Sequence, residues 1–116
     1  MTQEVPPVSG VEQDNGATIV RLAGELDLYN AHLVREALLD VCAAKPERVV
    51  VDLGDVTFVD STALGVLIEA SKALENRRAF LLASPGLETR RALEVSGLDR
   101  HFTVLDSVEA ALAADL

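Results

Sequence analysis

The sequence predicts an α/β fold: a mixed, mostly parallel sheet of about four to five strands with an N-terminal hairpin, covered by about four helices. Two observations carry this prediction. Strand-like and helix-like segments alternate after an initial pair of strand-like segments, and a chain of 116 residues fits one domain with one core. That domain is expected over residues 8–116. Residues 1–7 carry two adjacent prolines and no periodicity, which indicates a flexible N-terminal arm.

The domain is predicted to begin with an antiparallel hairpin. Residues 8–13 and 17–22 flank Asn15-Gly16, a dipeptide that readily takes the positive φ values of a tight turn. The stretch Gly-Glu-Leu-Asp at residues 24–27 then ends the second strand.

The first helix is predicted over residues 30–44 and the third strand over residues 49–51. Pro46 breaks the chain between them, and three consecutive valines are typical of a parallel strand buried on both faces. A helix between two strands forms a crossover, so these strands should be parallel. The apolar face of this helix is expected to contain Val34, Ala37, Leu38, Val41 and Cys42.

The strand–helix order then repeats towards the C-terminus. A bend at residues 60–62 leads into a helix over about residues 62–76 and an apolar strand over residues 79–83. A short helix is then predicted to open at residues 84–86 and to reach Ser96, where Gly97 supplies the left-handed residue that commonly ends a helix. A strand over residues 102–105 follows, and a terminal helix through Leu116 starts from a capping-box-like pair, Asp106 and Glu109.

Composition disfavours several classes of protein. The formal net charge is −9, which disfavours nucleic-acid binding because phosphate neutralisation requires clustered Lys and Arg. Cys42 is the only cysteine, so neither a disulfide framework nor a zinc site is predicted. The N-terminus lacks a signal-peptide layout, and the apolar runs fall short of the ~20 residues that span a bilayer. We therefore expect a cytoplasmic protein without membrane insertion; the oligomeric state stays open.

Catalysis is also disfavoured. His32 and His101 are the only histidines, and the chain has neither a Gly-x-Ser-x-Gly elbow nor a Gly-rich phosphate loop. A receiver domain phosphorylated on aspartate would need a lysine at the end of a late strand, and neither Lys45 nor Lys72 lies there. The chain is therefore predicted to be no enzyme and to bind no metal or cofactor.

The candidate site is Asp60-Ser61-Thr62, at a strand-to-helix bend. These residue types are preferred helix N-caps, so capping alone explains them. A hydroxyl at a helix start also lies beside unpaired backbone N–H groups and the positive end of the helix dipole, which suit a phosphate. The two roles are compatible. Added phosphate would crowd Asp60, and we expect Asp27 and Asp55 at the same end of the sheet.

The helix after this bend has a start that is apolar almost all round. Only one side of it can face the sheet, so its outer face is expected to bind a partner protein. We expect this surface to include Ala63, Val66 and Ala70, and to end where Glu69 and Lys72 restore polarity.

The strings FVDSTALGVL and VVVDLGDVT, preceded by GELD, resemble the STAS domain of bacterial anti-sigma-factor antagonists. The resemblance implies that the serine directly after the aspartate, here Ser61, is phosphorylated by an anti-sigma factor that is itself a serine kinase. The unphosphorylated form would capture that factor and free sigma, and a serine phosphatase would restore it. ATP would be held by the kinase, so the chain itself would need no cofactor. The neighbouring Thr62 is a rival acceptor and a candidate partner contact.

Several alternatives stay open within this resemblance. The family often has glycine where this chain has Ala63, which is compatible with a changed partner. Asp27 could contact the partner or kinase, or could instead cap the first helix. The same fold would also serve a scaffold subunit of a stress-signalling assembly or a cytoplasmic accessory subunit of a transporter.

Overall fold

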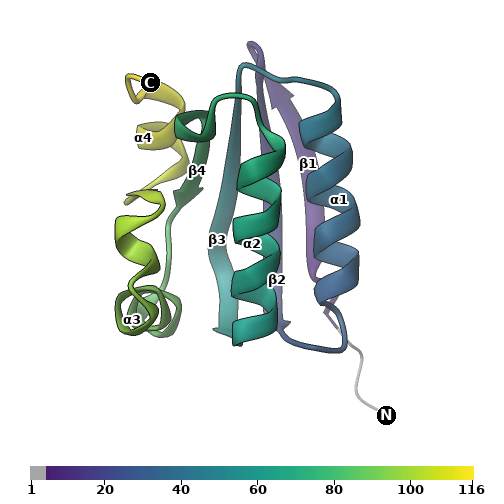
Figure 1. Ribbon diagram of the computed structural model, residues 1–116, viewed down its shortest axis with the longest axis vertical. Helices are drawn as coiled ribbons and strands as arrows, with labels where there is room; N and C mark the ends of the chain where they lie inside the picture. Colours follow the sequence, from purple (N-terminus) through teal and green to yellow (C-terminus); the bar gives the residue numbers. More distant parts are fainter. Residues whose placement is uncertain (1–4) are drawn as a thin grey trace.

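Five strands form one mixed sheet in the computed structural model, which describes residues 5–116 (Figure 1). The strand order is β1-β2-β3-β4-β5; β1 is antiparallel to β2, and every later neighbouring pair is parallel. This confirms the predicted fold class. The strands are β1 (Val8–Asp14), β2 (Ala17–Leu26), β3 (Arg48–Val59), β4 (Phe80–Ala83) and β5 (Thr103–Leu105). The helices are α1 (Ala31–Ala43), α2 (Ser61–Ala73), α3 (Leu87–Ser96) and α4 (Val108–Ala113), with short 3-10 turns η1 (Arg77–Ala79) and η2 (Leu98–Arg100).

The hairpin forms as predicted. Asn15 and Gly16 take φ values of 48° and 89°, which the turn between β1 and β2 requires. The pairing continues upstream of β1, because the Ala23 amide donates to the Pro7 carbonyl at 3.0 Å. Residues 1–4 of the predicted arm lie outside the described residues.

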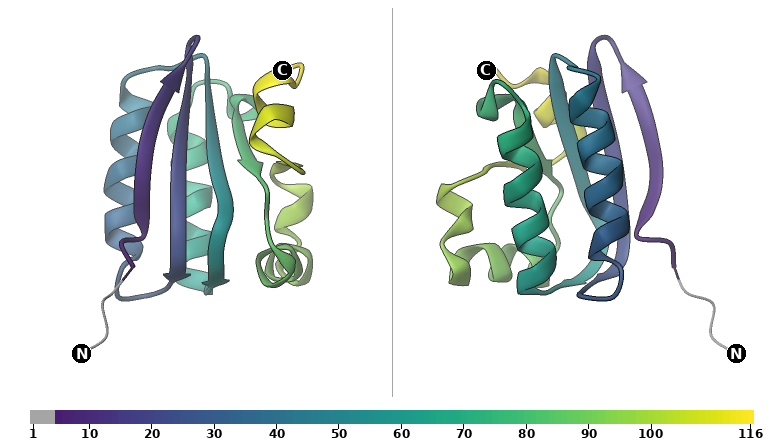
Figure 2. Two further views of the ribbon diagram at one scale, coloured as in Figure 1. Left: turned by 180° about the vertical axis from the view of Figure 1, so that it is seen from behind. Right: turned by 45° about the vertical axis from the view of Figure 1, so that its right-hand side comes forward.

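Two hydrophobic clusters, one on each face of the sheet, bury β3. Val49 and Val51 join the larger cluster, while Val50 between them packs with Ala111 of α4 in the smaller one. Figure 2 shows α1 and α2 against one face and α4 on the other. Successive strand residues point to opposite faces, so the three valines are fully buried, as predicted.

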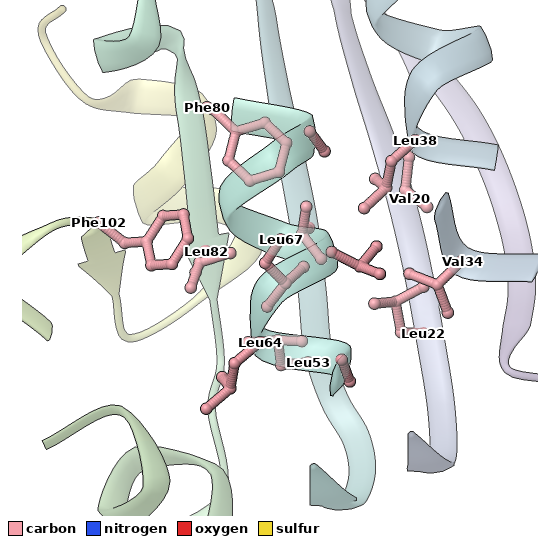
Figure 3. Close-up of a cluster of buried hydrophobic side chains, with 14 of the residues drawn as sticks. Val20, Leu22, Val34, Leu38, Leu53, Leu64, Leu67, Phe80, Leu82 and Phe102 are labelled. Carbon is pink, nitrogen blue, oxygen red and sulfur yellow. The ribbon is translucent and has the colours of Figure 1, made fainter. Parts of the chain in front are cut away.

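The larger cluster is built almost entirely from aliphatic side chains (Figure 3). It joins β2, β3 and β4 to α1 and α2, and Leu93 of α3 belongs to it. Helix α1 contributes Ala31, Val34, Leu38 and Cys42. The predicted Ala37 and Val41 are only half-buried. Burial raises the pKa of the Cys42 thiol, and its Sγ lies 3.6 Å from the Ala70 carbonyl oxygen.

The prediction of an apolar outer face on α2 is wrong. Ala63, Val66 and Ala70 are 2%, 8% and 1% exposed. Helix α2 packs against the sheet and also against α1. Glu69 of α2 forms an ion pair of 2.7 Å with Arg35 of α1. The sheet and α1 cover two sides of α2, so the wide apolar surface of this helix is buried in the core.

Several predicted boundaries also move. Strand β3 continues to Val59, and β2 to Leu26, because their second halves pair in parallel. The terminal helix is capped by Ser107, whose Oγ accepts from the Ala110 amide at 3.0 Å, so the capping role predicted for Asp106 is wrong. It ends at Ala113. Gly97 takes φ 78° at the end of α3, as predicted.

Within residues 5–116, every helix is too short or too polar to cross a membrane. The same residues contain no group of three or more His, Cys, Asp and Glu side chains placed to hold a metal ion.

Candidate functional site

Ser61 is the first residue of α2 and is exposed. It follows Asp60, the N-cap residue, which takes extended backbone angles and whose Oδ1 accepts a hydrogen bond from the Ala63 amide at 3.0 Å. The carboxylate therefore satisfies one of the free N–H groups at the start of the helix. This confirms a cap at the bend and assigns it to Asp60, which leaves the Ser61 side chain free of that role.

The second carboxylate oxygen of Asp60 fixes a neighbouring loop. Its Oδ2 accepts from the Leu28 amide at 3.0 Å, and the Asp60 amide donates to the Leu26 carbonyl at 3.0 Å. Asp60 thus joins the start of α2 to the loop between β2 and α1. These two segments are far apart in the sequence but meet because β2 and β3 end side by side, with Leu26 opposite Val59.

Asp27 shapes that loop. Its Oδ1 accepts from the amides of Tyr29 and Asn30 at 3.0 and 3.3 Å, while its own amide donates to Asn30 Oδ1 at 2.9 Å. Asn30 occupies the N-cap position of α1 and makes no side-chain capping bond. Asp27 therefore stabilises a turn before the helix. The alternative that Asp27 caps α1 is wrong, because the N-cap position is occupied by Asn30.

The loop and the end of β3 expose three large apolar side chains. Leu28 is 66% exposed, Tyr29 85% and Phe58 48%. Leu28 is bonded to Asp60, and Phe58 lies two residues before Asp60 in the chain. We call Leu28, Tyr29 and Phe58 the apolar rim of Ser61. Sequence reasoning missed them; the signal was an apolar pair, Leu28-Tyr29, between two turn-forming polar residues.

The structure thus brings together some of the predicted site residues and separates others. Asp27, Asp60, Ser61 and Thr62 gather at the end of the sheet where β2 and β3 terminate. Asp55 lies opposite Ala23 inside β3, before the strand ends, so its predicted place in this group is wrong. Ala63, Val66 and Ala70 are in the core. The exposed side of α2 is formed by Thr62, Gly65, Glu69 and Lys72.

An Asp60→Ala chain should be less stable than the native chain by about 1–2 kcal/mol, because the substitution removes the α2 cap. Loss of the bond to the Leu28 amide adds to this cost. Urea denaturation followed by circular dichroism measures the difference. Asp55→Ala is the matched control, since Asp55 is exposed and this substitution removes the same charge. Equal stability of the two variants would contradict the capping role.

Comparisons with known proteins agree with this geometry. The family model described as the STAS domain matches residues 10–111. The anti-sigma-F factor antagonist RsfB of Mycobacterium tuberculosis is 32% identical over 102 residues, covering 88% of this chain and 84% of that protein. An anti-sigma-B factor antagonist of Listeria monocytogenes is 40% identical over 90 residues, covering 75% of this chain and 77% of that protein.

A solved structure of a similarly named protein has the same fold. The crystal structure of an anti-sigma factor antagonist from Mycobacterium paratuberculosis superimposes with a TM-score of 0.83 at 31% identity, covering 88% of this chain and 87% of that one. The match to the STAS family model spans most of the described chain, from within β1 to α4, and it includes the bend at Ser61 and the parallel strands. The chain belongs to the STAS domain family.

Proposed function

We propose that this chain is an anti-sigma-factor antagonist whose unphosphorylated form binds an anti-sigma factor of the serine-kinase type and thereby releases a sigma factor. Phosphorylation of Ser61 by that kinase switches binding off, and a serine phosphatase reverses the change. The observation that carries the proposal is an exposed serine at a helix start, whose cap residue Asp60 also holds the loop that exposes Leu28 and Tyr29. Relatives named as anti-sigma factor antagonists support it.

The apolar rim supplies a docking surface that the buried face of α2 does not. Large exposed apolar and aromatic side chains are typical of protein interfaces. Tyr29 is 85% exposed, so a partner could cover nearly the whole ring. The partner surface we propose therefore consists of Leu28, Tyr29 and Phe58 together with Asp27, Asp60 and Thr62.

The charge at this site suits a switch. Phosphate adds about 1.5 to 2 negative charges at neutral pH. On Ser61 these charges would lie beside the carboxylate of Asp60, with Asp27 in the adjoining loop. A partner that covers the apolar rim would have to desolvate the phosphate, so binding is lost without any change in the fold.

Incubation with the cognate anti-sigma kinase and ATP, followed by phosphopeptide mass spectrometry, tests the acceptor. We expect label on Ser61 in the native chain and in Thr62→Ala, and none in Ser61→Ala. Thr62→Ala is the matched control because both hydroxyls are exposed at the start of α2. Label on Thr62 alone would show that Thr62, and not Ser61, is the phosphate acceptor. A native chain that neither binds the kinase nor accepts phosphate would overturn the proposed function.

A further inference from the structure

A second candidate site lies at the other end of α2 from Ser61. A pocket of about 240 Å³ opens between the last turns of α2, η1 and η2, and is lined by Ser71, Arg77, Arg100, His101 and Phe102. Ser71 is ten residues beyond Ser61 on the same helix, which corresponds to about 15 Å along the axis. The pocket is therefore separate from the site of the proposed switch.

The positive charge of this pocket stands out in an acidic chain. Asp and Glu number 19 against 10 Lys and Arg. Arg21, Arg35, Arg90 and Arg91 each form an ion pair with a carboxylate, and Arg48 donates to two carbonyl oxygens at the end of α4. Within residues 5–116, the arginines whose guanidinium groups have neither a carboxylate within 4.0 Å nor a hydrogen bond to a carbonyl oxygen are Arg77, Arg78 and Arg100. Two of these three line the same pocket.

The chemistry of the lining suits a phosphate group. Guanidinium groups bind phosphate oxygens through paired, charge-assisted hydrogen bonds. Two arginines and a histidine line this one pocket. No Asp or Glu lines the pocket. The His101 ring lies edge-on against the buried Phe102 ring, with centroids 4.8 Å apart, and this contact restricts its orientation.

The volume of the pocket suits a small ligand. About 240 Å³ is below the ~300–1,000 Å³ of pockets that hold drug-sized ligands. A compact anion therefore fits better than a whole nucleotide. The geometry points to a binding site for a small free phosphate-class anion, phosphate or pyrophosphate, held by Arg77 and Arg100 with His101.

Titration of the ¹⁵N-labelled full chain with sodium phosphate, and separately with sodium pyrophosphate, tests this site by amide chemical shifts. We expect saturable shifts at Ser71, Arg77, Arg100, His101 and Phe102 with either probe, and none with sodium chloride at equal ionic strength. Arg77→Gln and Arg100→Gln should each weaken binding at least about tenfold, because each removes a charge-assisted contact.

Arg78→Gln is the matched control. Arg78 lies in the same short turn and carries the same charge, but it does not line the pocket, so its variant should bind like the native chain. Circular dichroism checks that all three variants are folded. The site is overturned if neither anion gives saturable shifts in the native chain, if Arg78→Gln weakens binding as much as the pocket variants, or if either pocket variant binds like the native chain.

Discussion

A Ser61→Glu chain should bind its anti-sigma factor about a hundredfold more weakly than the native chain, a loss of about 2.7 kcal/mol. The new carboxylate would stand at the first position of α2, next to Asp60 and the apolar rim. A partner that buries Leu28 and Tyr29 would have to strip water from this charge, and burying an unpaired charge is costly. Isothermal titration calorimetry with the purified anti-sigma factor measures the change.

Two further variants separate charge from size at this position. Ser61→Gln matches the shape of Ser61→Glu without its charge, so it should retain most of the affinity. Ser61→Ala should bind like the native chain and should continue to bind after incubation with kinase and ATP, whereas the native chain is released. Equal affinities of the Ala, Gln and Glu variants would show that charge at Ser61 does not control binding.

The sheet topology could be predicted because local signals agreed with the tertiary structure. The Asn15-Gly16 turn specifies a tight hairpin, and the valine run at 49–51 is compatible with little other than a strand buried on both faces. The part of β3 beyond the valine run could not be predicted in this way. Its first residues include Asp52, Gly54 and Asp55, which locally favour turns; Asp52 and Asp55 nevertheless pair with β2, and the register shifts between these two pairs.

The candidate site was predictable in its polar part and not in its apolar part. Asp60 and Ser61 carry a local helix-start signal, which needs no knowledge of neighbours. The partner surface depends on which side of α2 is covered, and periodicity does not reveal how many neighbours a helix has. Leu28 and Tyr29 are exposed in a loop whose position depends on Asp27 and Asp60, from two distant segments. No local pattern specifies that arrangement.

A Val66→Asp chain should be destabilised by at least ~3 kcal/mol, because the substitution places an unpaired charge in the core. Val66 is 8% exposed and belongs to the larger hydrophobic cluster. Thermal unfolding followed by circular dichroism should show a fall in Tm of at least ~10 °C. Domains are stable by only ~5–15 kcal/mol, so part of the population could be unfolded at room temperature.

The matched control for this substitution is Gly65→Asp, one residue earlier on the same helix. Gly65 is exposed, and a Cβ added there would meet nothing within 4 Å. Aspartate also has a higher helix propensity than glycine, so this variant should remain folded. If Val66→Asp instead kept the native Tm and lost only partner binding, Val66 would belong to the docking surface. The fold predicts the opposite: α2 uses its apolar residues to join α1 to the sheet, and the partner is left with the rim around Ser61.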